Sequence, residues 1–230
     1  LTIASLLPLL IASVSAILPS YFFFGSEIIL PFELKDTFNI SEVPYYVLLG
    51  ILASVCSLYF SRVYFKSTSM LARITSPVAR LIIGDLALGV LIYFIPPLYG
   101  EGYNVVNNLL HENYLQALGT NLFNAYLDNI WVVIILLAGL VVFKIIATSL
   151  TFSAGGVGGI FAPVMFMGSA MGHCFALILN NLGIFSNKIS VSNFTLVGMA
   201  GLMAGVLHAP LTAIFLIAEL THGYELFIPL

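Results

Sequence analysis

Long apolar blocks separated by short polar stretches run along the whole chain. They lie at Leu1–Phe24, Val43–Phe60, Val78–Leu98, Val105–Leu118, Ile130–Leu150, Ile160–Leu179, Phe194–Leu207 and Leu211–Leu220, and another begins near Leu226. None shows the alternation of apolar and polar residues expected of barrel strands, so we expect helices. Several blocks are shorter than the roughly 20 residues of a perpendicular membrane crossing. The pattern therefore predicts an all-α fold, a polytopic membrane helical bundle with tilted and half-spanning helices.

Composition supports a membrane environment and excludes several other classes. Hydrophobic residues make up 60% of the chain and charged residues only 7%, whereas soluble domains carry about 25% charged residues. The net charge of −3 is too small to indicate a nucleic-acid partner. The two cysteines, Cys56 and Cys174, lie in apolar sequence without metal-type spacing. We therefore expect no disulfide, no metal site and no cofactor.

The charged residues orient the bundle. Acidic side chains dominate the first polar linker, where Lys35 alone opposes Glu27, Glu33, Asp36 and Glu42. The second linker is basic and contains no acid between its four cations, Arg62, Lys66, Arg73 and Arg80. The positive-inside rule then predicts that the linker 62–80 is cytoplasmic and the acidic linker lies outside. The expected location is the plasma membrane or a bacterial inner membrane.

A glycine-rich run leads into one of the apolar blocks. It reads Gly155-Gly156-Val157-Gly158-Gly159-Ile160-Phe161-Ala162-Pro163. Proline is well tolerated in the first turn of a helix, so the run predicts extended backbone that turns into a helix with free amides. Such backbone at membrane depth must be buried in protein or line a polar cavity.

Free amides at a helix N-terminus, with the positive end of the helix dipole behind them, favour an anion. No Lys or Arg lies between Lys144 and Lys188, so we expect dipoles rather than a full charge to hold the anion. Weak binding of this kind suits rapid release. The alternative, that the glycines merely form a tight loop between packed helices, remains open on spacing alone.

Several motifs in order resemble the CLC family of chloride channels and chloride/proton antiporters. The segment Gly159–Pro163 matches the family's G-x-F-x-P signature. Downstream, Gly198-Met199-Ala200-Gly201, His208-Ala209-Pro210-Leu211-Thr212-Ala213 and Glu219-Leu220-Thr221 resemble its next helices. Upstream, Tyr99-Gly100-Glu101-Gly102-Tyr103 resembles its glycine-rich loop. The similarity covers essentially the whole chain, and one departure is Val157, which stands where many members have proline.

The resemblance implies a fold and a site. CLC proteins are homodimers whose subunits each carry an anion pathway built from two inverted repeats. Residues 1–42 would be the last helix of the first repeat and the outer linker, and 43–230 most of the second repeat, all within one transmembrane domain. The backbone amides of Ile160 and Phe161 would bind the anion, with Gly158, Gly159, Ala162 and Pro163 forming the surrounding loop and helix start. Residues 1–20 and the helices from about 212 onward would lie near the dimer interface.

The implied function is transmembrane transport of chloride or a similar small anion, by a channel or a chloride/proton antiporter and not an enzyme. The family's serine and gating-glutamate signatures of the first repeat do not occur here. Its anion-coordinating tyrosine would fall after Leu230. Because the chain opens inside an apolar run without a charged n-region or cleavage site, we expect a piece of a longer protein.

Other residues suggest competing functions. Ser169 and His173 are four residues apart on one helix face, which leaves an intramembrane serine hydrolase conceivable. A transporter of another solute and a purely structural membrane subunit are further alternatives. We expect His173 and His208 to be packing histidines and Glu219 to be a structural acid near a helix end, although an acid in an apolar helix can also transfer protons. The G-x-x-x-G pairs Gly168/Gly172 and Gly201/Gly205 predict close helix packing.

Overall fold

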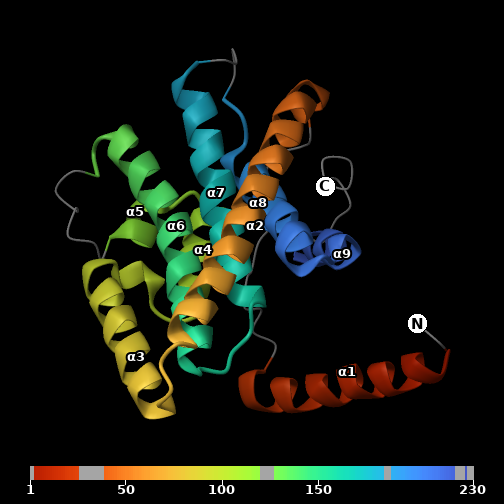
Figure 1. The fold of residues 1–230 in the computed structure, drawn as a ribbon. Helices are drawn as coiled ribbons and strands as arrows, with labels where there is room; N and C mark the ends of the chain where they lie inside the picture. The colour runs from red at the N-terminus through yellow and green to blue at the C-terminus, as the bar shows by residue number, and fades with distance from the viewer. Residues whose placement is uncertain (1–2, 26–38, 120–126, 184–187, 221–225, 227–230) are drawn as a thin grey trace. The chain divides into compact units, whose positions relative to one another are not determined.

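The computed structural model describes residues 3–25, 39–119, 127–183, 188–220 and 226 (Figure 1). The chain divides into two compact units, Leu1–Pro31 and Phe32–Leu230, and each is described by itself. The first contains α1 (Ile3–Phe24). The second contains η1 (Ile40–Glu42), α2 (Val43–Leu71), α3 (Pro77–Phe94), η2 (Pro96–Leu98), α4 (Tyr103–Leu110), α5 (Tyr114–Leu118), α6 (Ile130–Ala154), α7 (Phe161–Asn181), α8 (Val191–Leu207) and α9 (Pro210–Leu220).

The predicted all-α fold class is confirmed, since the described residues form helices and no strands. Four helices are long and apolar enough to cross a membrane: α2 together with η1, α3, α6 and α7. Three other helices are far shorter, with 8 residues in α4, 5 in α5 and 11 in α9. A helix of 11 residues spans about 16 Å, roughly half the hydrocarbon thickness. The expectation of half-spanning helices is therefore confirmed.

The connection between α2 and α3 is shorter than the sequence suggested. The predicted linker 62–80 is wrong in extent, because α2 continues to Leu71 and α3 begins at Pro77. Residues 61–71 contain no glycine or proline, and arginine and lysine are good helix formers, so nothing ends the helix at the apolar boundary. Of the four basic residues, Arg73 lies in the short turn and Arg80 near the start of α3, whereas Arg62 and Lys66 lie on the last three turns of α2.

The apolar block at 105–118 is divided rather than continuous. Glu112 has a φ of 61°, a left-handed conformation that an L-residue adopts in turns and not within helices. It separates α4 from α5. The Oγ of Ser192 donates a hydrogen bond to its carboxylate at 3.1 Å, which fastens this turn to the start of α8.

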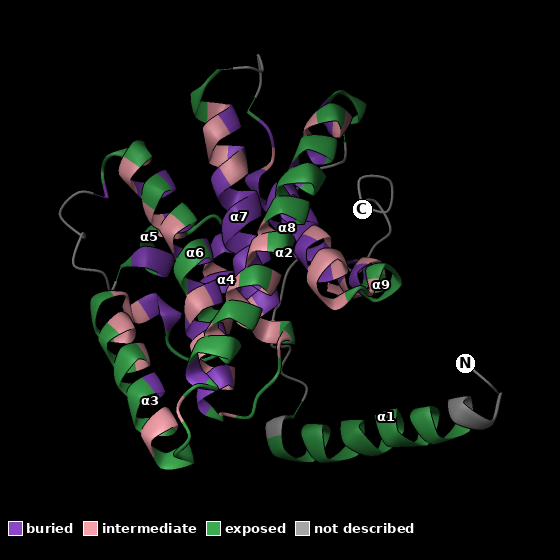
Figure 2. Ribbon diagram, viewed as in Figure 1, coloured by how far each residue is buried: buried purple, intermediate pink, exposed green. Residues whose placement is uncertain are grey.

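The core of the second unit is the contact between α7 and α8, whose residues are largely buried (Figure 2). A Cβ added to Gly168 would lie 2.6 Å from the carbonyl oxygen of Gly198, and one added to Gly172 would meet the carbonyl oxygen of Phe194. The two backbones therefore touch, as helices in membranes do where small residues face each other. This confirms the close packing predicted for the first glycine pair.

The opposite side of α8 packs on α2 through the second glycine pair. An added Cβ at Gly201 would lie 3.3 Å from the Cβ of Ala53, and one at Gly205 would lie 3.0 Å from the Cβ of Ser57. Tyr46 and Phe194 stack at the upper part of the same interface, with ring centroids 4.2 Å apart. Close packing is confirmed here as well.

Helices of both units expose apolar side chains. On α3 these include Val78, Ile82, Leu86, Val90 and Phe94, and Figure 2 shows most of that helix as exposed. The described side chains of α1, residues 7–23, are also exposed and largely apolar. Such surfaces suit contact with lipid or with another apolar protein surface.

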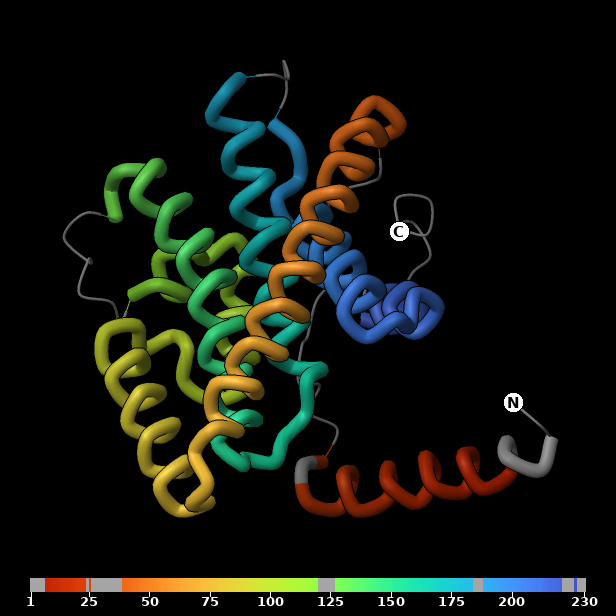
Figure 3. Tube along the Cα trace, viewed as in Figure 1, coloured from red at the N-terminus to blue at the C-terminus, as the bar shows by residue number. Residues whose placement is uncertain are grey.

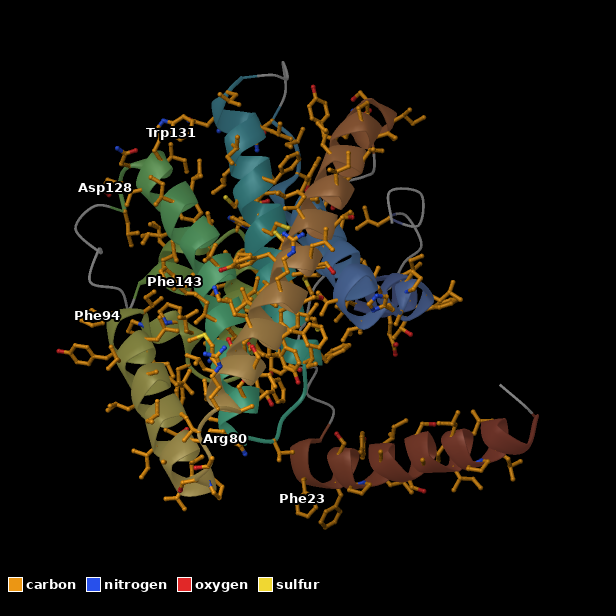
Figure 4. The ribbon with its side chains drawn as sticks, viewed as in Figure 1. Phe23, Arg80, Phe94, Asp128, Trp131 and Phe143 are labelled. Atoms are coloured by element: carbon orange, nitrogen blue, oxygen red, sulfur yellow. The ribbon has the colours of Figure 1, made fainter. Side chains whose placement is uncertain are left out.

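The two ends of the second unit differ in charge. Arg80 lies at the lower end in Figure 4, near the α2–α3 connection, whereas Asp128 and Trp131 lie near the upper end, where α6 begins. Trp131 is half exposed, which is common for tryptophan at a membrane–water boundary. Of the predicted acidic linker, Glu27, Glu33 and Asp36 lie outside the described residues. Glu42 is buried and accepts a hydrogen bond from the Tyr46 hydroxyl at 3.1 Å, so it is not a solvated linker charge.

Candidate functional site

The first two residues of the glycine-rich run end α6. Gly155 has a φ of 114° and its N–H donates to Phe152 O at 3.2 Å. The N–H of Gly156 reaches back to Thr151 O at 2.9 Å. A Cβ on Gly156 would lie only 2.8 Å from that same oxygen. This is a glycine-dependent helix end, in which a left-handed residue lets the next amides satisfy the last carbonyls.

Neighbouring helices hold this end of α6 in place. The hydroxyl of Ser153 lies 3.1 Å from that of Thr68 on α2, and the ring of Phe152 packs edge-on against Tyr64, with centroids 6.3 Å apart. On the other side, a Cβ added to Gly84 of α3 would meet the Cβ of Ala154. The glycine-rich run therefore starts from a fixed point.

Beyond Gly156 the chain rises from the lower end of α6 to the start of α7, part-way up the bundle (Figure 3). Phe161 is the first residue of α7, and its N-cap residue, Ile160, gives no side-chain cap. The first amide of this turn that is bonded to backbone belongs to Val164, which donates to Ile160 O at 3.1 Å.

The amides of residues 158–162 donate to no other described backbone group. Pro163 has no N–H and lies in the first turn, where the sequence placed it. Free donors thus converge on a helix N-terminus, the place where the helix dipole favours negative charge.

A cavity of about 530 Å³ lies against this segment. Five of the six predicted site residues line it: Gly158, Gly159, Phe161, Ala162 and Pro163. The sixth, Ile160, is not among the lining residues, and the roles of its amide and that of Phe161 stay predictions. A Cβ added to Gly159 would meet no atom within 4 Å, so the backbone there borders open space. The other lining residues come from α3, the 98–103 segment and α6.

Lys144 is the residue that the sequence analysis missed. It is buried on α6 and lines the cavity. Its Nζ donates to Leu98 O at 2.9 Å and to Gly100 O at 2.8 Å, and lies 4.7 Å from the centroid of the Phe166 ring. A basic side chain thus shares the cavity with the free amides, and the expectation that dipoles rather than a full charge hold an anion here stays a prediction. The signal was a lone lysine in the middle of an apolar block, since ionisable residues in membrane helices are usually functional.

The 98–103 segment forms another wall of the cavity that the glycine-rich run lines. Gly100 and Gly102 have φ values of 65° and 85°, and a Cβ on Gly102 would meet the Phe166 ring. Glu101, between them, lines the cavity and is exposed. Burial, followed by the charge of Glu101, raises the pKa of Tyr103. The phenol therefore stays neutral to a higher pH than an ordinary tyrosine, which leaves Glu101 as the acidic group of this wall.

The residues behind the hydrolase alternative are not arranged for catalysis. Ser169 donates its hydroxyl hydrogen to Phe166 O at 2.8 Å, within its own helix. His173 is buried, as expected of a packing histidine, and its Nδ1 lies 3.3 Å from the Thr195 hydroxyl. Because that hydroxyl donates to Val191 O, it is left to accept from Nδ1. Neither contact joins the serine to the histidine.

Two further expectations have different outcomes. His208 is not a packing histidine: it is exposed and caps α8 with a φ of 55°, because the helix must end before Pro210. Glu219 is exposed and is the last residue but one of α9, so its position near a helix end is as expected. Among the described residues, no group of three or more His, Cys, Asp or Glu could hold a metal ion.

Comparison with known proteins decides the family. Residues 1–230 match the family described as Voltage gated chloride channel. This chain belongs to that family. The recognition made from the sequence motifs is thus confirmed, and the helical bundle agrees with the helical CLC fold.

Relatives within the CLC family include proteins named chloride channel and proteins named H(+)/Cl(-) exchange transporter. The chain is 32% identical to a ClcB-like protein of Ralstonia nicotianae, covering 100% of this chain and 49% of the relative. It is 29% identical to the voltage-gated ClC-type chloride channel ClcB of Salmonella typhimurium, over 98% of this chain and 50% of the relative. It is 27% identical to the H(+)/Cl(-) exchange transporter ClcA of Vibrio campbellii, over 90% of this chain and 41% of the relative. The chain thus spans half or less of the length of these relatives.

Proposed function

We propose that this CLC chain forms one wall of a pathway that carries chloride or a similar small anion across a membrane. The observation that carries the proposal is the cavity at the start of α7. There, residues 158, 159, 161 and 162, whose amides have no described backbone acceptors, and the buried Lys144 line one space. The names of the relatives, chloride channel and H(+)/Cl(-) exchange transporter, support the same substrate.

The anion would be held by backbone amides at the α7 N-terminus, those of Ile160 and Phe161, after losing part of its hydration. Amide donors in a site shielded from bulk water interact more strongly than they would in water. They also leave the anion free to depart, because they carry partial charges only. Phe161 lines the cavity and is half exposed, which supports its amide over that of Ile160 as the nearer donor.

The structure supports further parts of this function as proposals. Exposed apolar side chains lie on α9, such as Leu211 and Phe215, and, in the first unit, on α1, such as Leu18, and on each helix they suit contact with a second subunit as well as with lipid. The α2–α3 connection with its four basic residues, Arg62, Lys66, Arg73 and Arg80, is proposed to face the cytoplasm, in a plasma membrane or a bacterial inner membrane.

The test is simultaneous measurement of chloride and proton flux from liposomes that contain the complete protein, under an imposed chloride gradient. Chloride efflux with uphill proton movement would establish an antiporter, and efflux without protons a channel. Protein-free liposomes measure the background leak of chloride and protons, which is subtracted. Folded protein without anion flux would refute the proposal and favour a transporter of another solute.

A further inference from the structure

The cation of Lys144 lacks a carboxylate partner among the described residues. Its contacts there are two carbonyl oxygens and one aromatic ring, at 2.9, 2.8 and 4.7 Å. Carbonyl oxygens and the face of a ring both stabilise a positive charge. None of them neutralises it. A buried charge is normally paired, because removing it from water is costly.

We propose that the anion carried by this protein is the counter-charge of Lys144, which makes Lys144 a determinant of anion affinity as well as an anchor of the 98–100 segment. The inference rests on the proposed function. Lys144 lines the same cavity as Gly159 and Phe161, so an anion at the amides enters the field of the ammonium. Lys144 itself is buried, so its charge is screened less by water than that of a surface lysine.

The contacts of Lys144 also connect it to the amides mechanically. Its ammonium holds the 98–100 carbonyls, and the ring below it, Phe166, belongs to the second turn of α7. A purely structural role would need only the hydrogen-bond donors. The proposed role needs the charge as well. The two roles therefore differ in what a neutral donor at this position would do.

Glu101 provides a charge of opposite sign on the same cavity. Lys144, Glu101 and the phenols of Tyr99 and Tyr103 are the ionisable side chains among its described lining residues. Glu101 repels an anion and competes with it for the field of Lys144. Neutralising Glu101 should therefore act in the opposite direction from neutralising Lys144.

The test is chloride binding to the purified complete protein, measured by isothermal titration calorimetry, with thermal unfolding as the check on folding. Lys144→Arg keeps charge and donors, whereas Lys144→Gln keeps donors and loses the charge. We expect chloride affinity to fall about 10- to 100-fold in Lys144→Gln, the range for hydrogen bonds to charged groups. It should stay within a few fold of wild type in Lys144→Arg and rise in Glu101→Gln. If Lys144→Gln does not fold, Lys144→Met, uncharged and of similar length, replaces it.

Unchanged chloride affinity in a folded, uncharged variant would overturn the inference while leaving the proposed function intact. Equal losses in Lys144→Arg and Lys144→Gln would overturn it too, since they would show an anchor and not a counter-charge. Wild-type protein that binds no chloride would refute both the inference and the proposed function.

Discussion

The hydroxyl oxygens of Thr68 and Ser153 lie 3.1 Å apart, across the interface between α2 and the last turn of α6. Thr68 donates its own hydrogen to Tyr64 O at 2.9 Å, so Ser153 is the donor in the pair. Ser153→Ala should cost about 1 kcal/mol, the usual contribution of a neutral hydrogen bond. It should also loosen the start of the glycine-rich run and weaken chloride binding slightly. Thermal unfolding and calorimetry measure the two effects.

A matched control for that substitution is Ser69→Ala. Ser69 is exposed and donates to Lys66 O within α2, so its loss removes a similar bond without touching α6. Chloride affinity should not change. If both variants alter chloride affinity equally, the Thr68–Ser153 contact does not position the run.

The amide of Phe161 can be tested without changing a side chain. Replacing residue 161 by its α-hydroxy acid converts that amide into an ester and removes the N–H alone. Because this N–H has no described backbone acceptor, we expect little loss of stability but a clear loss of chloride affinity, about tenfold for one donor to an anion. Phe161→Ala retains the amide and should have a smaller effect.

The same ester at residue 164 provides the contrast. The N–H of Val164 donates to Ile160 O at 3.1 Å, so its removal should lower stability by about 1 kcal/mol and leave chloride affinity nearly unchanged. An ester at 161 that binds chloride like wild type would contradict the amide site.

Two glycines of the run should respond differently to alanine. Gly155 has a φ of 114°, where a side chain costs about 1–3 kcal/mol, so Gly155→Ala should destabilise the protein. At Gly159 an added Cβ meets no atom within 4 Å, and Gly159→Ala should fold normally but reduce anion flux by occupying cavity space. Thermal unfolding and liposome flux distinguish them. Normal flux in Gly159→Ala would place the anion elsewhere.

The contact between α7 and α8 predicts a stability defect. In Gly172→Ala the new methyl group meets the carbonyl oxygen of Phe194, and overpacking of this kind costs about 1–3 kcal/mol. The control is Gly89→Ala on α3, where a Cβ meets nothing within 4 Å and helix propensity improves. Unfolding temperatures in detergent should fall for the first variant and hold or rise for the second.

Orientation can be tested by labelling single cysteines in cells. In a background with Cys56 and Cys174 replaced, a membrane-impermeant maleimide should label Asp128→Cys from outside. Ser76→Cys should react only after permeabilisation, since it lies in the basic turn between α2 and α3. The reverse pattern would invert the proposed topology.

Local features were predictable from the sequence, because each is encoded by neighbouring residues. Apolar blocks marked the helices, and Gly168 and Gly172 marked a close approach because spacing of four places both on one face. The start of α3 was also readable in principle: the Ser76 side chain caps it and Pro77 follows at N1. The basic residues on either side of this capping signal favour a longer linker, so the helix start is hard to recognise from charge alone.

The role of Lys144 could not be predicted in the same way. Its acceptors, Leu98 O and Gly100 O, are 46 and 44 residues away in sequence, and a single sequence does not state which loop meets which helix. The sequence suggested the amides because they belong to one contiguous motif. The charge beside them became visible only in the packed fold.

The height at which α7 begins has an electrical consequence. Its first residues lie above the lower end of α6 (Figure 3), so an anion at the proposed site would cross part of the membrane potential from either side. Crossing half of a 100 mV potential changes the energy of a monovalent anion by about 1.2 kcal/mol, about a sevenfold change in occupancy. Under the proposed function, membrane voltage would thus act on the filling of this site directly, without a moving charged segment.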